Sequence, residues 1–362
     1  MHVAEAPATR EELGAALAAA GEAGTPVRFR GAGTKRLWAR PAPPEALELS
    51  TAGLNNLLEH NAGDLTAVVE PGVLLADAQA TFAKEGQMLA LDPPGSGATI
   101  GGVVATADTG PLRARYGGPR DLVVGMRVAL SDGTLAKSGG KVIKNVAGYD
   151  IAKLFTGSFG TLGAIIELSL RLHPLPPDTS TALGGSADPD EFARGAAALA
   201  QSALEHYGLD VRWEAGRGTV LARFAGAAPR PQAEAAEVLL RREGLSTEIL
   251  DDDTSVWDEQ RAAQRGPLVV KVSGLPTRLP ALLRAVDELG ASLVGRAALG
   301  VSWLRFEEPS TPAVERLRRD WIAVVQDRPA EFDIDPWGEL DPAALALMQR
   351  VKERFDPAGV CV

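Results

Sequence analysis

Three stretches in the first half of this chain combine glycine with lysine and arginine and contain no acidic residue. They cover residues 26–44, 110–120 and 133–149. Because the 362 residues together have a formal net charge of −10, these local excesses of positive charge need an explanation. Glycine lets the backbone turn tightly and approach a ligand closely, and nearby cations offset the charge of an anion. The sequence therefore predicts a first half made of short elements and turns around a large, doubly charged anion.

The first of these stretches, RFRGAGTKRLW, begins at Arg28 and follows a short predicted strand. The dinucleotide-binding pattern G-x-G-x-x-G is not met, because Gly31 and Gly33 are followed by Arg36 and the prolines beyond it prevent a long helix. A turn of successive backbone N–H groups can still hold phosphate oxygens without such a helix. Taken alone, a basic surface turn is the simpler interpretation, and the other two stretches are what favour a cofactor.

The composition excludes several other classes of protein. The single cysteine, Cys361, excludes an internal disulfide and cannot hold an iron–sulfur cluster. No metal site is expected, because the four histidines lie far apart in the sequence. No apolar run reaches the roughly 18 residues that a membrane span needs, and the acidic balance argues against binding of nucleic acid. The amino-terminal residues lack the pattern of a signal peptide, so we expect a cytoplasmic protein.

The order of elements changes at residues 173–190, a cluster of proline, glycine, serine and aspartate that is typical of an exposed joint. Before this joint, short strands alternate with helices such as EELGAALAAAG, which should end at Gly21. After it, the order strand, helix, strand, strand, helix, strand occurs twice. We therefore expect an α+β fold whose second half is a duplicated ferredoxin-like (split βαβ) domain, with an antiparallel sheet and helices on one face.

A series of motifs resembles a known family. They are RGAGTK, VEPGV, TIGGVVAT, YGGPRDLVVGMRVALSDG, GGKVIKNVAGYDIAKLFTGSFGTLGAI and the closing RFDPAGV. They are similar to the FAD-binding flavoproteins of the vanillyl-alcohol oxidase and p-cresol methylhydroxylase (PCMH) type, and the segment KNVAGYDIAKLFTGSFGTLG is most similar to the FAD-binding subunit of glycolate oxidase. The resemblance implies a two-lobed FAD-binding domain over residues 1–175, a cap domain over 178–335 and a segment over 336–362 that returns to the FAD-binding domain.

The resemblance also implies which residues hold FAD: two loops on the pyrophosphate, then residues that follow the cofactor toward the flavin ring and the adenine. These positions are Arg30, Gly31, Ala32, Gly33, Thr34, Lys35, Pro94, Gly95, Thr99, Ile100, Gly101, Gly102, Ala105, Thr106, Gly110, Arg113, Tyr116, Gly163 and Ile165. Some relatives attach FAD covalently through a histidine in the first loop. Thr34 occupies that region here, so FAD should be bound non-covalently.

The catalytic residues stay unassigned. Relatives that oxidise D-lactate or glycolate carry a histidine-rich motif near the carboxyl terminus for metal and substrate, whereas no histidine follows His206 in this chain. The usual base for a 2-hydroxy acid is therefore missing from its expected place. The resemblance then implies the FAD-binding subunit of a glycolate (2-hydroxy acid) oxidase complex, with a second flavin subunit and an iron–sulfur subunit as partners. The complex would lie in the cytoplasm, or at the inner face of the membrane through those partners.

Other functions remain open at this point. A self-sufficient FAD-dependent 2-hydroxy-acid dehydrogenase would bind its substrate carboxylate with arginines such as Arg296 or Arg305. A non-catalytic scaffold subunit would keep the fold without using FAD. A sugar-nucleotide reductase of the same superfamily would need NADPH, and no sequence feature favours it.

Two polar groups have simple structural roles. Tyr149 and Asp150 resemble an acid–base pair, but a helix cap by Asp150 is the simpler interpretation. The acidic run DDDTSVWDEQ should be the solvated start of a helix, with Asp253 or Thr254 as its N-cap, rather than a cation site.

Overall fold

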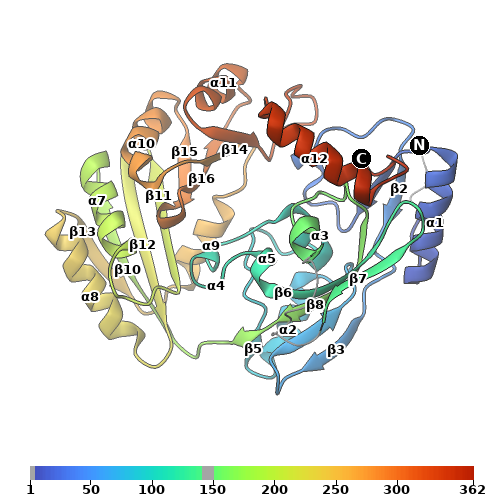
Figure 1. The fold of residues 1–362 in the computed structure, drawn as a ribbon. Coiled ribbons are helices and arrows are strands. Elements are labelled where there is room, and N and C mark those ends of the chain that lie inside the picture. Colours follow the sequence, from blue (N-terminus) through green and yellow to red (C-terminus); the bar gives the residue numbers. More distant parts are fainter. Residues whose placement is uncertain (1–4, 141–150) are drawn as a thin grey trace.

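The computed structural model describes residues 5–140 and 151–362, which form two regions that each contain a large sheet (Figure 1). The sheet of the first region has five strands and that of the second has eight, and every strand pair in both is antiparallel. The predicted α+β class with an antiparallel sheet is therefore confirmed. The pair Tyr149 and Asp150 lies outside the described residues.

The first region begins with a helix and a parallel pair of short strands, and continues into the five-stranded sheet in the order β3-β4-β8-β6-β7. Its strands are β1 (Val27–Arg30), β2 (Leu47–Ser50), β3 (Leu57–Asn61), β4 (Thr66–Val69), β5 (Gln87–Met88), β6 (Val123–Ala129), β7 (Leu135–Gly139), β8 (Ala164–Arg171) and β9 (His173–Pro174). Its helices are α1 (Arg10–Ala23), the 3-10 turn η1 (Arg36–Trp38), α2 (Leu75–Ala83), α3 (Ile100–Thr106), α4 (Arg113–Tyr116), α5 (Pro119–Leu122) and α6 (Ile151–Phe155).

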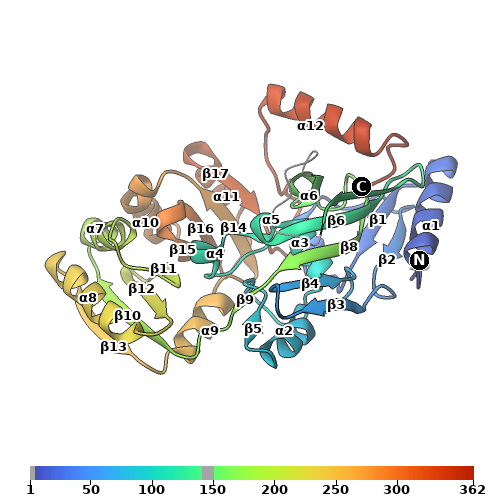
Figure 2. The same cartoon turned by 60° about the horizontal axis from the view of Figure 1, so that its bottom comes forward.

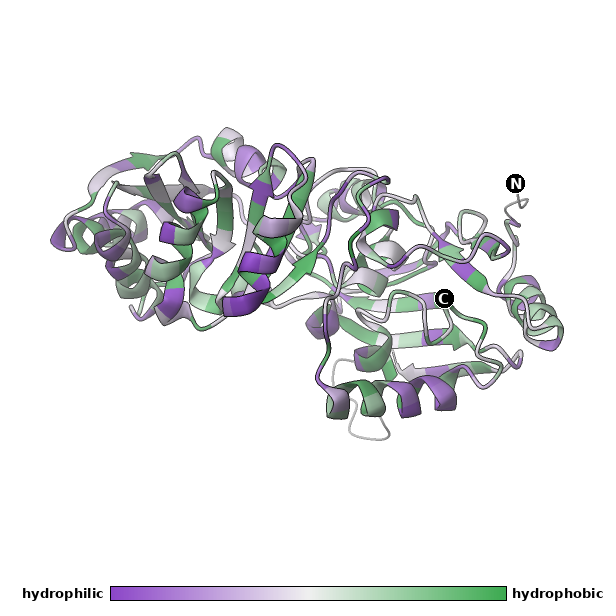
Figure 3. Ribbon diagram, turned by 90° about the horizontal axis from the view of Figure 1, so that it is seen from above, coloured by the Kyte–Doolittle hydropathy of each residue, from purple (hydrophilic) through white to green (hydrophobic). Residues whose placement is uncertain are grey.

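This region has two hydrophobic cores, in keeping with two lobes. The smaller core joins α1 and the β1–β2 pair through residues such as Leu13 and Leu49, and it includes Cys361 from the end of the chain. The larger core packs α2 and α3 against the five-stranded sheet. The carboxyl end runs beside β1, since the Val27 N–H donates to the Val360 carbonyl at 2.7 Å and the Val362 N–H donates to the Val27 carbonyl at 2.9 Å. The carboxyl terminus consequently lies over the first region (Figure 3).

The second region contains the expected duplication. The first unit is β10 (Thr179–Ser186), α7 (Pro189–Ala200), β11 (Gly208–Glu214), β12 (Arg217–Ala225), α8 (Pro229–Arg242) and β13 (Ser246–Leu250). The second is β14 (Leu268–Ser273), α10 (Leu279–Glu288), β15 (Ser292–Arg296), β16 (Val301–Phe306), α11 (Thr311–Asp320) and β17 (Ile322–Val325), with short turns η2 (Pro276–Arg278) and η3 (Ala297–Leu299). The strand order β13-β10-β12-β11-β15-β16-β14-β17 shows that the two units join through β11 and β15.

The two faces of the eight-stranded sheet differ because alternate residues of a strand point to opposite sides. Val211 and Leu304 belong to the core beneath α7, α8, α10 and α11, which lie on one face (Figure 2). Asp210 and Trp303, each one residue away, lie on the opposite face. An additional helix, α9 (Thr254–Ala262), covers part of that face, because the indole N–H of Trp257 donates to Thr181 Oγ1 at 2.8 Å. The polar face of the sheet is therefore turned toward the first region.

The last helix, α12 (Pro342–Phe355), stands away from both sheets and buries none of its side chains fully (Figure 2). Lys352 attaches its carboxyl end to the first region by donating to the carbonyls of Thr161 at 3.0 Å and Cys361 at 2.7 Å. Asp356 accepts from the N–H groups of Val360 and Cys361 and so orders the chain end.

One local prediction was wrong, and a second was right in position but not in side-chain contacts. The helix α1 passes through Gly21 and ends at Gly24, which has a φ of +63°. Gly21 is needed for packing instead, because a Cβ there would lie 2.3 Å from the Ser131 carbonyl oxygen. Asp253 is the N-cap residue of α9, as predicted, and Asp251 and Asp252 beside it are exposed, but the Asp253 side chain makes no capping hydrogen bond and the residue is 2% exposed. It binds Arg223 and the hydroxyl groups of Thr179 and Thr181.

Candidate cofactor-binding site

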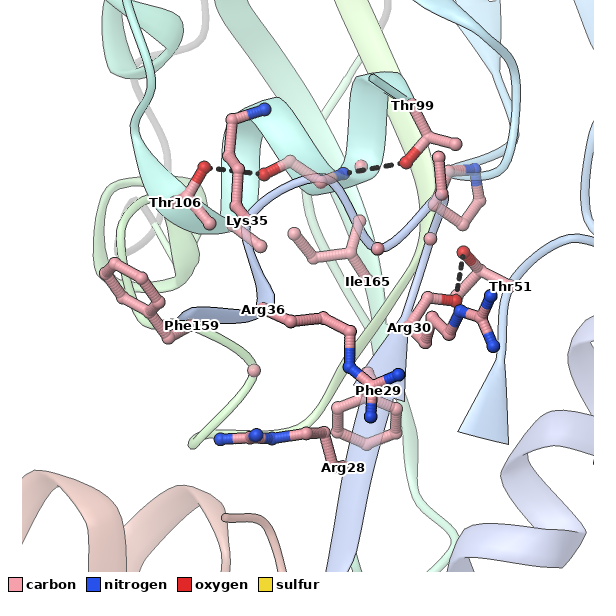
Figure 4. A pocket seen from close by; sticks show the side chains of 18 of the residues that line it. Arg28, Phe29, Arg30, Lys35, Arg36, Thr51, Thr99, Thr106, Phe159 and Ile165 are labelled. Carbon is pink, nitrogen blue, oxygen red and sulfur yellow. Dashed lines mark hydrogen bonds between the residues drawn. The ribbon is translucent and has the colours of Figure 1, made fainter. Parts of the chain in front are cut away.

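A cleft that is partly open to solvent lies in the first region between the turn after β1, the helix α3 and the turn before β8 (Figure 4). It is lined by Arg28, Phe29, Arg30, Gly31, Ala32, Gly33, Thr34, Lys35, Arg36, Ala39, Thr51, Pro71, Thr99, Gly101, Gly102, Ala105, Thr106, Phe159, Gly160, Gly163, Ala164 and Ile165. The cleft thus brings together most of the residues that the sequence assigned to FAD.

The turn after β1 offers unpaired backbone donors to this cleft. Within the described part of the chain, the N–H groups of Ala32, Gly33 and Thr34 donate no hydrogen bond. Gly33 has a φ of +77°, a left-handed conformation that glycine adopts without strain. The turn is anchored at its start, because the Thr51 N–H donates to the Arg30 carbonyl at 2.8 Å. Successive free N–H groups of this kind form a concave site for phosphate oxygens.

The second turn, at the start of α3, contributes shape rather than free donors. The N–H groups of Ile100 and Gly101 donate to the carbonyls of Val73 and Pro71, both at 2.9 Å, and the Gly102 N–H donates to Thr99 Oγ1 at 3.2 Å. The N–H groups of these three residues are therefore already used within the protein.

The first turn touches Thr99 of the second, the second turn touches Pro71 before α2, and only glycine permits these two contacts. A Cβ on Gly31 would lie 2.2 Å from Thr99 Oγ1, and a Cβ on Gly101 would lie 2.5 Å from Pro71 Cβ. Both distances are far below van der Waals contact, so side chains at these positions would force the loops apart. At these two positions the floor of the cleft is consequently backbone without side chains, so a diphosphate can approach it closely.

A third wall of the cleft, the turn at Phe159 and Gly160, was not predicted as part of the site. The Phe159 N–H donates to the Ala105 carbonyl at 2.8 Å, and its ring packs edge-on against Trp337 with 5.0 Å between ring centres. Phe159 has a φ of +57°, unusual for a residue with a side chain. The glycines around it in the motif FTGSFGTLG were the signal that could have identified this turn.

Not all of the predicted residues reach the cleft. Pro94, Gly95, Ile100, Gly110, Arg113 and Tyr116 are absent from its lining. Ile100 is in the core, and Gly110 packs so tightly on Asp92 that a Cβ would lie 1.8 Å from the Asp92 carbonyl oxygen. Tyr116 stacks on His173 with 4.5 Å between ring centres. We propose that these residues act further along the cofactor, or only support the fold.

The cations around the cleft are mostly paired with protein groups. Arg30 and Arg36 both bind Glu48, at 2.8 and 3.2 Å. Lys35 Nζ lies 3.2 Å from Asp108 Oδ2 and points away from Arg28 and Arg36 in Figure 4. Burial lowers the pKa of the Lys35 amine, against the opposing effect of Asp108. Lys35 therefore contributes its backbone to the cleft and its charge to the interior.

A second group of cations lies between the two regions, on the polar face of the eight-stranded sheet. Arg296 is 1% exposed, lies 4.2 Å above the ring of Trp303, and donates to Gln264 Oε1 at 2.9 Å. Its Nε and Nη1 atoms are buried without a hydrogen-bond partner in the described structure, although Asp210 lies 3.7 Å from Nε. Burial lowers the pKa of the Lys271 amine, and the charge of Arg113 lowers it further. Arg113 belongs to the first region and the other two to the second, so three positive charges meet across the boundary.

The other arginine proposed from the sequence, Arg305, is used differently. Its Nη2 binds Glu307 at 2.7 Å, and Glu307 is largely exposed to solvent. Of the two candidates for a carboxylate contact, only Arg296 lies in the buried group between the regions.

Asp92, beside this group, predicts a measurable pH dependence of stability. Burial raises the pKa of its carboxyl from 3.8 to about 7, against the opposing charges of Arg261 and Arg296. An acid with a higher pKa in the folded state holds its proton more tightly there than in the unfolded chain. Its contribution to the stability of the fold is therefore complete below its pKa in the unfolded chain and is lost as the pH rises to about 7. The free energy of unfolding, measured with urea, should fall between about pH 5 and about pH 8 in the unmodified chain. It should fall less over the same range in Asp92→Asn, which has no carboxyl group to titrate at this position. Equal losses in both would contradict this assignment.

The part of the chain that the structure describes holds no helix with the length and apolar character that a bilayer crossing requires. In the same residues, no group of three histidine, cysteine or acidic side chains is arranged to bind a metal ion.

Comparisons with known proteins fit this geometry. The family described as "FAD binding domain" matches residues 2–139. Glycolate oxidase subunit GlcD of Bacillus subtilis is 37% identical over 180 residues, which are 49% of this chain and 38% of that protein. Glycolate oxidase subunit GlcE of Escherichia coli is 35% identical over 154 residues, 42% of this chain and 43% of that protein. The matches thus span less than half the length of these curated relatives.

Among solved structures, an alkyldihydroxyacetonephosphate synthase is similar over 98% of this chain and 75% of its own, with a TM-score of 0.73 and 15% sequence identity. At this identity the likeness establishes the fold alone, and it extends across both regions. The matched residues, the motifs and the bare-backbone cleft agree: over residues 2–139 this chain carries an FAD-binding domain of the PCMH type.

Proposed function

We propose that the chain is the FAD-binding subunit of a complex that oxidises glycolate or another small 2-hydroxy acid. The observation that carries the proposal is the cleft between Gly31 and Thr99, whose unpaired N–H groups at Ala32, Gly33 and Thr34 suit the diphosphate of FAD. The names of the relatives, glycolate oxidase subunits and D-lactate dehydrogenases, support the substrate class.

The chain should hold FAD without a covalent bond. Among the described residues that line the cleft there is no histidine, cysteine or tyrosine, the side chains that attach flavins. Thr34, at the position the resemblance relates to a covalent histidine, has a hydroxyl group that is not nucleophilic without a neighbouring base. Binding would therefore depend on the backbone donors and on the shape of the cleft.

The substrate would lie between the regions, where Lys271, Arg113 and Arg296 concentrate positive charge. When bound, FAD supplies the acceptor for the hydride that leaves the hydroxyl-bearing carbon. The protein's own part is to hold the substrate carboxylate by charge-assisted hydrogen bonds and to exclude water with the Trp303 face of the sheet. We assign no proton acceptor.

Partners are part of the proposal. The relatives are named as subunits, and the single cysteine of this chain, Cys361, is 0% exposed with a pKa raised by burial to about 12. Electrons would therefore leave through iron–sulfur centres on another chain, beside a second flavin subunit. We place the complex in the cytoplasm or at the inner face of the membrane through these partners.

The test is purification of the tagged chain from its native host, followed by an absorption spectrum and identification of accompanying chains. We expect flavin absorption that acid precipitation releases into the supernatant, together with a second flavoprotein and an iron–sulfur protein. A colourless chain that takes up no added FAD would overturn the proposal. Flavin that stays with the precipitated protein would contradict non-covalent binding.

A second candidate, a dehydrogenase that needs no partner, is favoured by the buried cations between the regions. Under anaerobic conditions, glycolate or D-lactate should then bleach the flavin of the isolated chain. Lys271→Met should raise the acid concentration for half-maximal bleaching about tenfold, the effect of losing one hydrogen bond to a charged group. Lys84→Met, which removes an exposed lysine at the end of α2, is the matched control and should leave the titration unchanged. No bleaching in the isolated chain, with bleaching in the complex, would reject this candidate.

A further inference from the structure

The loop that supplies the free donors, residues 31–40, has little backbone structure of its own. It leaves the sheet after Arg30 and rejoins it at Leu47, where β2 begins. Its one short turn, η1, is closed by a 3.2 Å hydrogen bond from the Trp38 N–H to the Lys35 carbonyl. A loop with unpaired N–H groups and so few internal bonds needs external contacts to keep those groups aimed into the cleft.

The strongest of these contacts come from the second region, almost 300 residues later. The indole N–H of Trp38, a side chain that is 2% exposed, donates to Asp327 Oδ1 at 2.7 Å. The guanidinium of Arg265 lies 4.7 Å above the same ring and donates to the same Asp327 oxygen at 2.9 Å. Asp327 is itself fixed to the eight-stranded sheet, since its carbonyl accepts from the Val269 N–H at 2.8 Å.

The residue after Asp327 holds the backbone of the same loop. Arg328, which is 6% exposed, donates from Nη1 to the Leu37 carbonyl and from Nη2 to the Ala39 carbonyl at 3.2 Å. Two neighbouring residues of the second region thus hold one side chain and two carbonyls of the cofactor loop.

Arg265 extends the network to the second turn of the cleft. Its Nη2 lies 3.6 Å from Asp108 Oδ2, the oxygen that also faces Lys35 Nζ at 3.2 Å. Asp108 follows α3 directly and is 3% exposed, and its N–H donates to the Val103 carbonyl at 3.1 Å. The two turns of the cleft and the far sheet are therefore joined through a single guanidinium.

We propose that Asp327, Arg328 and Arg265 are positioning residues for FAD, because they hold the 31–40 loop in its cofactor-binding conformation. The second region would then set the affinity for FAD, although the residues that line the cleft belong to the first region. The inference rests on FAD binding in the proposed function, and not on the identity of the substrate. It assigns a cofactor role to residues that lie outside the matched FAD-binding segment 2–139.

The experiment measures the dissociation constant of FAD for the full chain, stripped of flavin, by the quenching of flavin fluorescence. Asp327→Ala should weaken FAD binding at least tenfold, and Arg328→Gln should weaken it in the same direction. Asp333→Ala, an exposed acid six residues away, is the matched control and should bind FAD like the unmodified chain. Trp38→Phe keeps an aromatic ring but loses the five-membered ring of the indole with its N–H, and combined with Asp327→Ala it should weaken binding no further than Asp327→Ala alone.

Unchanged affinity in Asp327→Ala and Arg328→Gln would overturn the proposal. If Asp327→Ala does not fold at the assay temperature, Trp38→Phe decides, and an affinity equal to that of the unmodified chain would overturn it. Because the experiment measures FAD binding, a chain that binds FAD but oxidises no 2-hydroxy acid would reject the proposed function alone. The positioning role of Asp327, Arg328 and Arg265 would not be affected by that result. An unmodified chain that binds no FAD rejects both.

Discussion

Replacement of Gly31 by alanine should weaken FAD binding about tenfold while leaving the fold intact. The added Cβ would lie 2.2 Å from Thr99 Oγ1, so the Thr99 side chain must turn away. That movement breaks the N-cap that Thr99 provides to the Gly102 N–H at 3.2 Å. Loss of such a cap costs about 0.5–2 kcal/mol of local stability. FAD must then bind a turn whose ordered conformation is disfavoured by that amount, and about 1.4 kcal/mol corresponds to a tenfold change in affinity. Fluorescence titration of the flavin-free chain with FAD measures the effect.

The matched control for this variant is Gly97→Ala, a second glycine of the cofactor-loop region. A Cβ at Gly97 would meet only Thr34 Cγ2, at the ordinary contact distance of 3.8 Å. Its FAD affinity should equal that of the unmodified chain. If Gly31→Ala bound FAD as tightly as Gly97→Ala, the close contact of the two turns would have no part in holding the cofactor.

Asp253→Ala should destabilise the second region by about 3–5 kcal/mol, the range for removal of one partner of a buried ion pair. The carboxylate of Asp253 accepts from Arg223 Nη2 at 2.6 Å and from Arg223 Nε at 2.9 Å, and from the Thr181 hydroxyl at 2.7 Å. Removing it leaves the guanidinium with the Thr179 hydroxyl, at 3.2 Å, in place of a carboxylate, and leaves the Thr179 and Thr181 hydroxyl groups without the acceptor they use. Urea unfolding followed by tryptophan fluorescence measures the change, since Trp257 shares the Thr181 hydroxyl.

The neighbouring acid Asp252 gives the control, because its side chain is exposed. Asp252→Ala should change the free energy of unfolding by no more than about 0.5 kcal/mol, as is usual for surface substitutions. A loss of less than about 1 kcal/mol for Asp253→Ala would show that the buried pair with Arg223 contributes little net stability.

The secondary structure of this chain was largely predictable from local patterns. The alternation in β10 to β13 and again in β14 to β17, with amphipathic helices between them, predicted the duplicated sheet that the structure contains. The errors were local too. Gly21 was taken as a helix end, because a glycine after an apolar run commonly stops a helix, but it lies inside α1, where packing against Ser131 excludes a Cβ.

The site was predictable in its backbone and not in its side chains. Gly31 and Gly101 were identified because tight turns and close approach require glycine, and both lie on the floor of the cleft. Lys35 was expected to face the cofactor, yet its amine pairs with Asp108. The sequence distance between these two residues gives no sign of the contact, which exists only because α3 packs beside the turn after β1.

Glycine spacing, residue alternation and charge along the chain were therefore enough to predict where the backbone turns, which faces are apolar and that the first region surrounds a large anion, whereas FAD itself was implied by the resemblance of the motifs. Tertiary structure alone decided which donors stay unpaired: among residues 5–140 and 151–362 the amides of Ala32–Thr34 have no partner, whereas those of Ile100–Gly102 are bonded within the protein. It also brought Asp327 against Trp38. The physical reason is that conformational preference is set by near neighbours along the chain, while hydrogen-bond partners and buried charges are set by segments that meet only after folding.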